Sequence, residues 1–198
     1  MNKIEGVIVN DRFLESIAIN LHNEARDAME GHRFKKIVPA LAFYCFTLES
    51  KLLTYGRAVF TDGAEYKKYI NSTLHGKFEW LLNRLNTPQA DVIEKCKSIV
   101  AEMVKFRNAL THSKNIEILE ERELIGLEKF DDRYVRVTSD DKDFMTLSTL
   151  DKLDDFYEVI SLLDRIWLVQ GRLHFKGDTS SLLVNISRAK VLNRDKDD

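Results

Sequence analysis

The chain has 198 residues, of which 44% are hydrophobic and 31% are charged, with only 2 Pro and 8 Gly. This composition excludes fibrous and disordered proteins, and so few helix breakers favour a single domain built mostly of long helices. A formal charge of −2 excludes a polycation that binds nucleic acid through its overall charge, so any contact with RNA has to be local.

Residues 1–10 carry an acidic residue, Glu5, and lack the apolar core of a signal peptide. No uninterrupted apolar stretch reaches the roughly 20 residues that a membrane span needs. We therefore expect a cytoplasmic protein that does not contact a membrane. The two cysteines, Cys45 and Cys96, lack the short spacing of a metal or redox motif, so we predict reduced, partly buried thiols.

Helical periodicity predicts a first helix that begins at Asn10 or Asp11 and ends at Gly31. A second helix follows, and Pro39 either opens it or kinks a helix that begins near Phe34. Because residues 40–48 are apolar nearly all round, we expect this helix at the centre of a bundle.

Two short helices are predicted between Ala64 and Leu85, and residues 86–88 then break the chain. Pro88 suits the first turn of a long amphipathic helix that runs to about His112. Its apolar positions recur at helical spacing and are Val92, Ile93, Cys96, Ile99, Val100, Met103, Val104 and Phe106.

Residues 115–147 lose the helical period, and short apolar runs between turn residues predict a small β-hairpin insertion. Ser148 or Thr149 can cap a last long helix. Beyond it, residues 182–186 suit a short strand or helix, and residues 193–198 are expected to form a frayed tail. The predicted fold class is therefore mainly α, an antiparallel helical bundle with a β-hairpin insertion before the last long helix. One domain is expected to cover residues 1–198.

The end of the long fourth segment reads Arg107-Asn108-Ala109-Leu110-Thr111-His112, an Arg and a His separated by four residues. This resembles the R-x4-6-H signature of the HEPN superfamily of helical domains. The resemblance covers about residues 11–113 and 148–171. A second Arg/His pair, Arg26 and His32, spans the expected end of the first helix and so lacks the helical context of the motif.

The resemblance implies a homodimeric, metal-independent endoribonuclease without a cofactor, of the kind that acts as a toxin or an antiviral effector. Its implied partners are RNA, a second copy of the chain and an antitoxin or regulatory protein. RNA supplies its own nucleophile, the 2′-hydroxyl, so cleavage needs a proton acceptor, a proton donor and positive charge on the phosphate. His112 can exchange the protons and Arg107 can hold two phosphate oxygens. DNA, which lacks the 2′-hydroxyl, should be inert.

Residues five apart on an ideal helix point about 140° away from each other, so Arg107 and His112 do not share a narrow face. The long Arg side chain, a helix that loosens at Thr111, or a two-fold dimer that brings two copies of the pair together can reconcile this geometry with a shared site. One histidine cannot transfer both protons at once, which favours the dimer.

Two further residues are candidates for supporting roles. Asn108 can hydrogen-bond the phosphate or orient His112, or it can simply be solvated. Glu49 lies among apolar neighbours in the central helix, so its carboxylate has to be paired or to lie at a cleft. The hypothesis is that it pairs with Arg107 or another basic residue and helps to fix the site; the alternative is an ordinary carboxylate at a helix edge, paired with Lys51 or Lys35. For the remaining histidines, His22, His32, His75 and His174, surface roles are expected.

Two other interpretations stay open. The first is a non-catalytic HEPN-like module that binds a partner protein or a nucleotide. Lys114 stands two residues after the His, where one toxin subgroup of the family carries Tyr, so the resemblance does not imply activity on nucleotide-modifying partners. The second is an unrelated helical bundle in which Arg107 and His112 have no common role.

Overall fold

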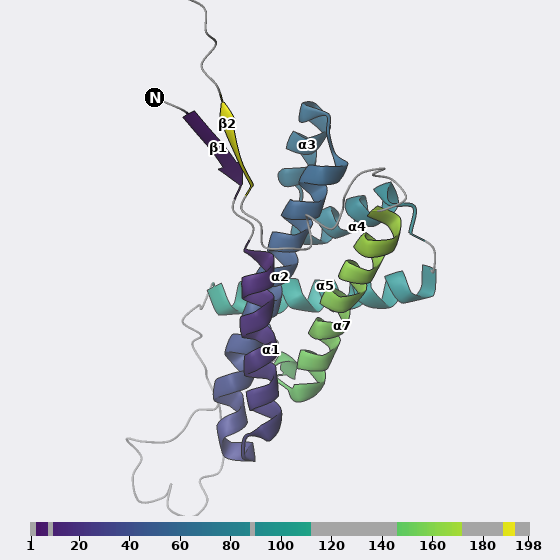
Figure 1. Cartoon of the computed structure of the whole chain (residues 1–198). Helices are drawn as coiled ribbons and strands as arrows, with labels where there is room; N and C mark the ends of the chain where they lie inside the picture. The colour runs from purple at the N-terminus through teal and green to yellow at the C-terminus, as the bar shows by residue number, and fades with distance from the viewer. Residues whose placement is uncertain (1–2, 8–9, 88–89, 112–145, 172–187, 193–198) are drawn as a thin grey trace, which may run out of the picture.

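A computed structural model of the chain describes residues 3–7, 10–87, 90–111, 146–171 and 188–192. The described part is mainly helical, as the composition predicts, and its long helices pack around one core, with the helix of residues 90–111 lying across the others (Figure 1). The predicted hairpin at 115–147, the predicted element at 182–186 and the predicted tail at 193–198 lie outside the described residues, except that 146–147 are described.

The first two helices form a hairpin. Helix α1 (Asp11–Asp27) begins where the sequence predicts, and helix α2 (Glu30–Val59) follows after two extended residues, Ala28 and Met29. The prediction that Gly31 ends the first helix is wrong, because Gly31 lies in the first turn of α2. The extended dihedral angles of Ala28 already break the helix, and Arg33 donates from Nε to the carbonyl of Ala28 at 2.9 Å.

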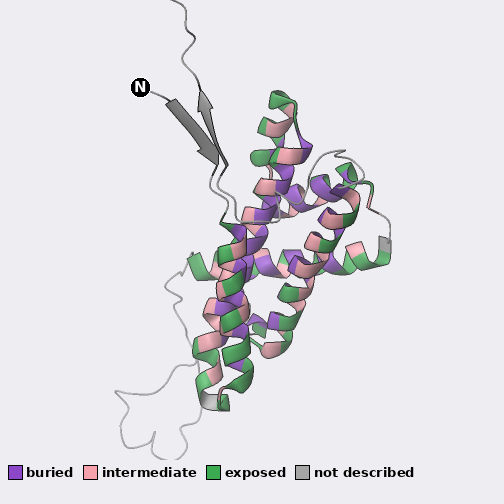
Figure 2. Ribbon diagram, in the orientation of Figure 1, coloured by how far each residue is buried: buried purple, intermediate pink, exposed green. Residues whose placement is uncertain are grey.

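Helix α2 is the central element, as its apolar sequence predicts. It packs against α1, α3, α4, α5 and α7, and its buried residues, coloured purple in Figure 2, recur along the helix. Pro39 lies inside the helix rather than opening it. The stretch His32–Val59 is long and apolar enough to cross a membrane by length and composition, but 56% of its most apolar window is buried inside the protein. This burial is typical of the core helix of a globular protein.

The two short helices predicted between 64 and 85 are α3 (Gly63–Ile70) and α4 (Leu74–Arg84). The side chain of Asp62 accepts hydrogen bonds from two backbone N–H groups of α3, and Thr73 caps α4 in the same way. Asn86 follows with a φ of 47°, a left-handed conformation that Asn tolerates and that ends the helical segment. The predicted break at 86–88 is confirmed for its described part.

Helices α5 (Ala90–Thr111) and α7 (Leu150–Ile166) complete the bundle, and a π-helical turn (η3, Trp167–Gly171) continues α7. Thr149 caps α7 by accepting from the backbone N–H of Lys152, as predicted. The ring of Phe106 meets that of Phe156 edge to face, with centroids 6.3 Å apart, and so fixes α5 against α7.

The two cysteines are free and buried, which confirms the prediction of unpaired thiols in this part of the chain. Burial raises the pKa of both Cys45 and Cys96, so neither thiol is activated as a nucleophile.

Two short strands were not predicted. β1 (Lys3–Val7) and β2 (Arg188–Leu192) pair antiparallel, with Lys3 opposite Leu192 and Val7 opposite Arg188. The periodicity of the helical segments contains no signal for this pairing, because it joins the two ends of the chain.

Candidate functional site

Arg107 lies in the last turns of α5 and meets a carboxylate of α2. Its Nη2 atom is 3.7 Å from Oε2 of Glu49. The two side chains are 37% and 35% exposed, so both are reachable from solvent. The sequence-based hypothesis that Glu49 pairs with Arg107 is confirmed as a contact.

The packing of the two helices explains this pair. Cys45 donates from Sγ to the carbonyl of Met103 at 3.5 Å. Glu49 is one turn after Cys45, and Arg107 is one turn after Met103, so the same helix crossing brings both pairs together. The pKa of Cys45 responds to this neighbourhood: burial raises it most, Arg107 lowers it and Glu49 raises it.

The alternative partner for Glu49, Lys51, points elsewhere. Its ammonium group is buried against Asp164 of α7 and Glu15 of α1. Residues 49 and 51 are two positions apart on α2 and therefore face different sides of the helix. Glu49 is thus part of the outer edge where α2 meets α5, as a functional role would require.

Asn108 is exposed on the same turn of α5 as Arg107. The helix remains regular to Thr111, whose hydroxyl donates to the carbonyl of Arg107 at 2.9 Å. Loosening at Thr111, one way to bring the motif residues together, is therefore not seen. His112 lies outside the described residues.

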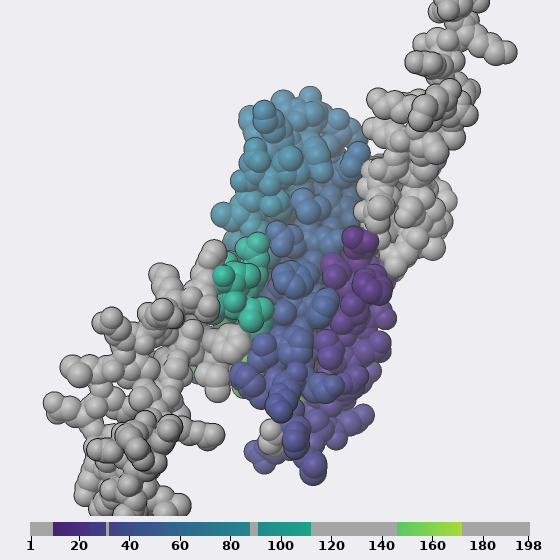
Figure 3. Space-filling model, turned by 90° about the vertical axis from the view of Figure 1, so that its left-hand side faces the viewer, coloured from purple at the N-terminus to yellow at the C-terminus, as the bar shows by residue number. Residues whose placement is uncertain are grey.

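Exposed apolar side chains flank the Arg107–Glu49 pair. Phe46 and Leu53 lie one turn before and one turn after Glu49 on α2, and Leu110 lies one turn after Arg107 on α5. We call these five residues the α2–α5 surface. Figure 3 shows this side of the molecule, where α2 lies between α1 and the C-terminal part of α5.

A second group of interacting residues, which was not predicted, is centred on Lys51. The ammonium group, fully buried, is 2.8 Å from Oδ1 of Asp164 and 2.9 Å from Oε2 of Glu15. Asp11 contributes a more distant carboxylate at 3.9 Å, and Arg12 lies 3.4 Å from the other oxygen of Asp164. Three carboxylates of α1 and α7 therefore share two cations.

A signal for this cluster exists in the sequence. Lys51 follows Tyr44 and Leu48 at the spacing of the buried face of α2, where a lysine needs acidic partners. Tyr55, one turn later, donates to Oδ1 of Asp164 at 2.7 Å. Burial and then the Asp164 charge raise the pKa of Tyr55, which keeps its phenol protonated as a donor.

A third cluster corrects a prediction. The surface role expected for His22 is wrong, because this residue is only 4% exposed. Its Nδ1 is 2.9 Å from the hydroxyl of Tyr44, and its Nε2 is 3.1 Å from Oδ1 of Asp154. Arg26, one turn later on α1, also contacts Asp154. The partners of His22 come from α2 and α7 and are far away in sequence, so helical spacing on α1 could not reveal them.

Burial lowers the pKa of His22 most, Arg26 lowers it further, and Asp154 opposes both effects. The neutral ring suits its neighbours: Nδ1 lies at hydrogen-bond distance from the Tyr44 hydroxyl, and Nε2 faces the Asp154 carboxylate as a close contact without hydrogen-bond geometry. This arrangement ties three helices together and presents no reactive nitrogen to solvent. His32 and His75 do have accessible side chains, as expected; His174 lies outside the described residues.

Across the described ranges, no group of three or more His, Cys, Asp or Glu side chains is arranged to hold a metal ion. Each of the three clusters has a cation that solvent reaches: the side chain of Arg107 is 37% exposed, that of Arg12 is 34% exposed and that of Arg26 is 53% exposed. Comparison of the chain with protein-family models, with curated proteins and with solved structures gave no match.

Proposed function

We propose that the chain is a metal-independent endoribonuclease that acts as a cytoplasmic homodimer, with Arg107 and His112 as its catalytic residues. The proposal rests on one observation above all: Arg107 is accessible at the end of α5 and is held there by Glu49. A guanidinium that is 37% exposed can take a phosphate in a bidentate contact.

The reaction follows from these groups. His112 of one subunit takes the proton of the RNA 2′-hydroxyl, whose oxygen attacks the adjacent phosphorus. Arg107 neutralises the charge that builds on the phosphate oxygens. The bond to the 5′ oxygen breaks, and the histidine of the second subunit gives that oxygen a proton. The products are a 2′,3′-cyclic phosphate and a 5′-hydroxyl.

Glu49 and Asn108 are positioning residues in this scheme. The Glu49 carboxylate limits the positions that the Arg107 side chain can adopt, and Asn108 lies exposed beside it. Because Arg107 and Glu49 are 3.7 Å apart, the pair is an ionic contact rather than a close hydrogen bond, so the N–H groups of the guanidinium stay available to phosphate.

The α2–α5 surface supports a dimer. Phe46, Leu53 and Leu110 expose apolar area around the pair, and a two-fold contact through such a patch is self-complementary. It would place two copies of the Arg107 helix end next to each other. We expect Leu53→Lys to shift the protein to a monomer in sedimentation experiments and to abolish RNA cleavage, because each site loses the second histidine.

The decisive experiment replaces His112 by Ala and incubates both proteins with RNA in the presence of a chelator. Wild type should cleave and leave 2′,3′-cyclic phosphate ends, and His112→Ala should lose this activity. His32→Ala is the matched control, because His32 belongs to the competing Arg/His pair and is exposed on α2. RNA left intact by wild type would argue instead for a non-catalytic module that binds a partner protein or a nucleotide. A toxin or an antiviral effector is the biological role that fits the proposed activity.

A further inference from the structure

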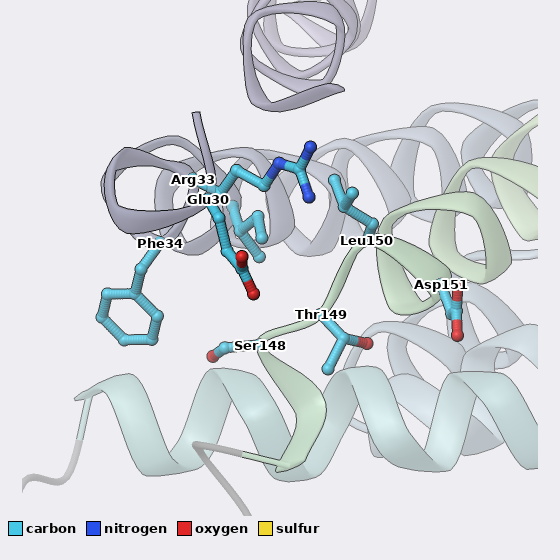
Figure 4. A pocket seen from close by; sticks show the side chains of 8 residues that line it. Glu30, Arg33, Phe34, Ser148, Thr149, Leu150 and Asp151 are labelled. Carbon is cyan, nitrogen blue, oxygen red and sulfur yellow. The ribbon is translucent and has the colours of Figure 1, made fainter. Parts of the chain in front are cut away.

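A pocket of about 330 Å³ opens where the beginning of α2 meets the beginning of α7. Figure 4 shows it above α5, with the two helix starts on either side. Its lining combines apolar, acidic, basic and hydroxyl side chains, from Glu30, Arg33, Phe34 and Ile37 of α2 and from Ser148, Thr149, Leu150 and Asp151.

The polar groups of the pocket are of opposite kinds. Glu30 presents a carboxylate, which accepts hydrogen bonds only, between Phe34 and Thr149 (Figure 4). Arg33 presents a guanidinium, which only donates, and its Nε is fixed by the carbonyl of Ala28 at 2.9 Å. A ligand that contacts both carries donors for the carboxylate and acceptors for the guanidinium.

The apolar groups set the shape of that ligand. Phe34 is a partly exposed aromatic ring, and Ile37 and Leu150 line the pocket as aliphatic side chains. Flat rings stack well on an exposed Phe, and a cavity of this size is at the lower end of small-molecule sites. A planar heterocycle therefore fits better than a flexible chain or a bare anion.

We propose that this pocket binds a guanine base, as part of the RNA on which the proposed nuclease acts. Guanine has two neighbouring donors, N1–H and N2–H, that match the Glu30 carboxylate. It also has two acceptors, O6 and N7, that match a guanidinium. Each of the other three bases has an acceptor next to the donor that would bind Glu30. This acceptor would face the second carboxylate oxygen, which is also an acceptor.

The position of the pocket suits a base-reading subsite. The pocket side of α7 contacts α5 near Arg107: Lys152, in the first turns of α7, lies 2.7 Å from Glu102 of α5. Arg107 follows Glu102 by five residues, which is about 7.5 Å along the helix. Along α2, Ile37 and Glu49 are about 18 Å apart. The base in the pocket thus belongs to a nucleotide near the scissile linkage rather than at it.

The test is direct binding, measured by NMR titration of the full chain with the four nucleoside 5′-monophosphates. We expect guanosine monophosphate to bind at least about tenfold more tightly than the others and to shift signals of the pocket residues. Glu30→Gln and Phe34→Leu should each weaken this binding by about tenfold. Glu94→Gln, which changes an exposed glutamate of α5 in the same way, should leave it unaltered.

Equal binding of all four nucleotides would overturn the proposal, and so would identical shifts with inorganic phosphate. Preferential binding of arginine amide would also overturn it. Because the titration does not depend on cleavage, the two proposals can fail separately. Guanine binding without RNA cleavage would reject the nuclease alone, and cleavage without guanine binding would reject the pocket alone.

Discussion

The ammonium nitrogen of Lys51 lies 2.8 Å from one carboxylate oxygen of Asp164 and 2.9 Å from the other. The lysine side chain is fully buried, and Glu15 supplies a second carboxylate at 2.9 Å. A charge in such a place is tolerated only when it is paired and hydrogen-bonded. This contact therefore joins α1, α2 and α7 at the centre of the protein.

Removing the Lys51 charge should destabilise the fold strongly. In Lys51→Met the carboxylates of Asp164 and Glu15 lose their buried partner and keep only Arg12, which is 34% exposed, so we expect the free energy of unfolding to fall by about 3–5 kcal/mol. Urea denaturation measures this change. Lys36→Met is the matched control: Lys36 pairs with Glu24 on the surface, and its loss should cost at most about 1 kcal/mol. The double variant Lys51→Met/Asp164→Leu should regain part of the loss, and no recovery would contradict the pairing.

The His22 cluster should make stability depend on pH. The folded protein favours neutral His22, with a pKa below the ordinary value of 6.5. The unfolded chain therefore binds a proton more readily than the folded chain. The stabilisation of the fold by neutral His22 is therefore complete above pH 6.5 and decreases as the pH falls below that value. We expect the free energy of unfolding to drop more between pH 8 and pH 5.5 for wild type than for His22→Gln. Parallel pH profiles would show that His22 does not titrate differently in the two states.

Gly56 should not accept even one methyl group. A Cβ atom placed there would lie 2.1 Å from Cε1 of Tyr69, and the hydroxyl of that Tyr donates to the carbonyl of Leu52. Gly56→Ala should therefore cost about 1–3 kcal/mol of stability, despite the better helix propensity of Ala. Gly63→Ala is the control, since a Cβ there has no neighbour within 4 Å. It should stabilise by about 0.4–1 kcal/mol, and thermal melts of both variants decide the matter.

Arg107 should be replaceable without loss of structure but not without loss of activity. Arg107→Lys keeps the charge and loses the planar fork, so we expect RNA cleavage to fall about 100-fold or more. The Arg107–Glu49 pair is about one third exposed, so stability should change by less than about 1 kcal/mol. Lys105→Met removes an exposed neighbouring cation and should reduce cleavage only by a small factor. Equal losses in both variants would indicate general attraction of RNA rather than a specific phosphate contact.

Local signals in the sequence were sufficient for much of the helical framework. The apolar period predicts α1, α2, α5 and α7, and Thr149 predicts the beginning of α7, because both depend on residues within a turn or two. The end of α1 was not predicted correctly, because backbone angles determine it. The helix ends at the extended residue Ala28, although Gly31 is the residue type that usually ends a helix.

Local sequence patterns are enough to show which faces of the helices are apolar, and they place Glu49 on the central helix, where a carboxylate has to be paired or to lie at a cleft. The partners of the buried charges depend instead on how the helices pack. Lys51 and Asp164 are 113 residues apart, and Tyr44 and Asp154 reach His22 from two other helices. Periodicity reports neighbours within one helix, whereas the electrostatic environment of a buried group is set by whichever helices pack against it.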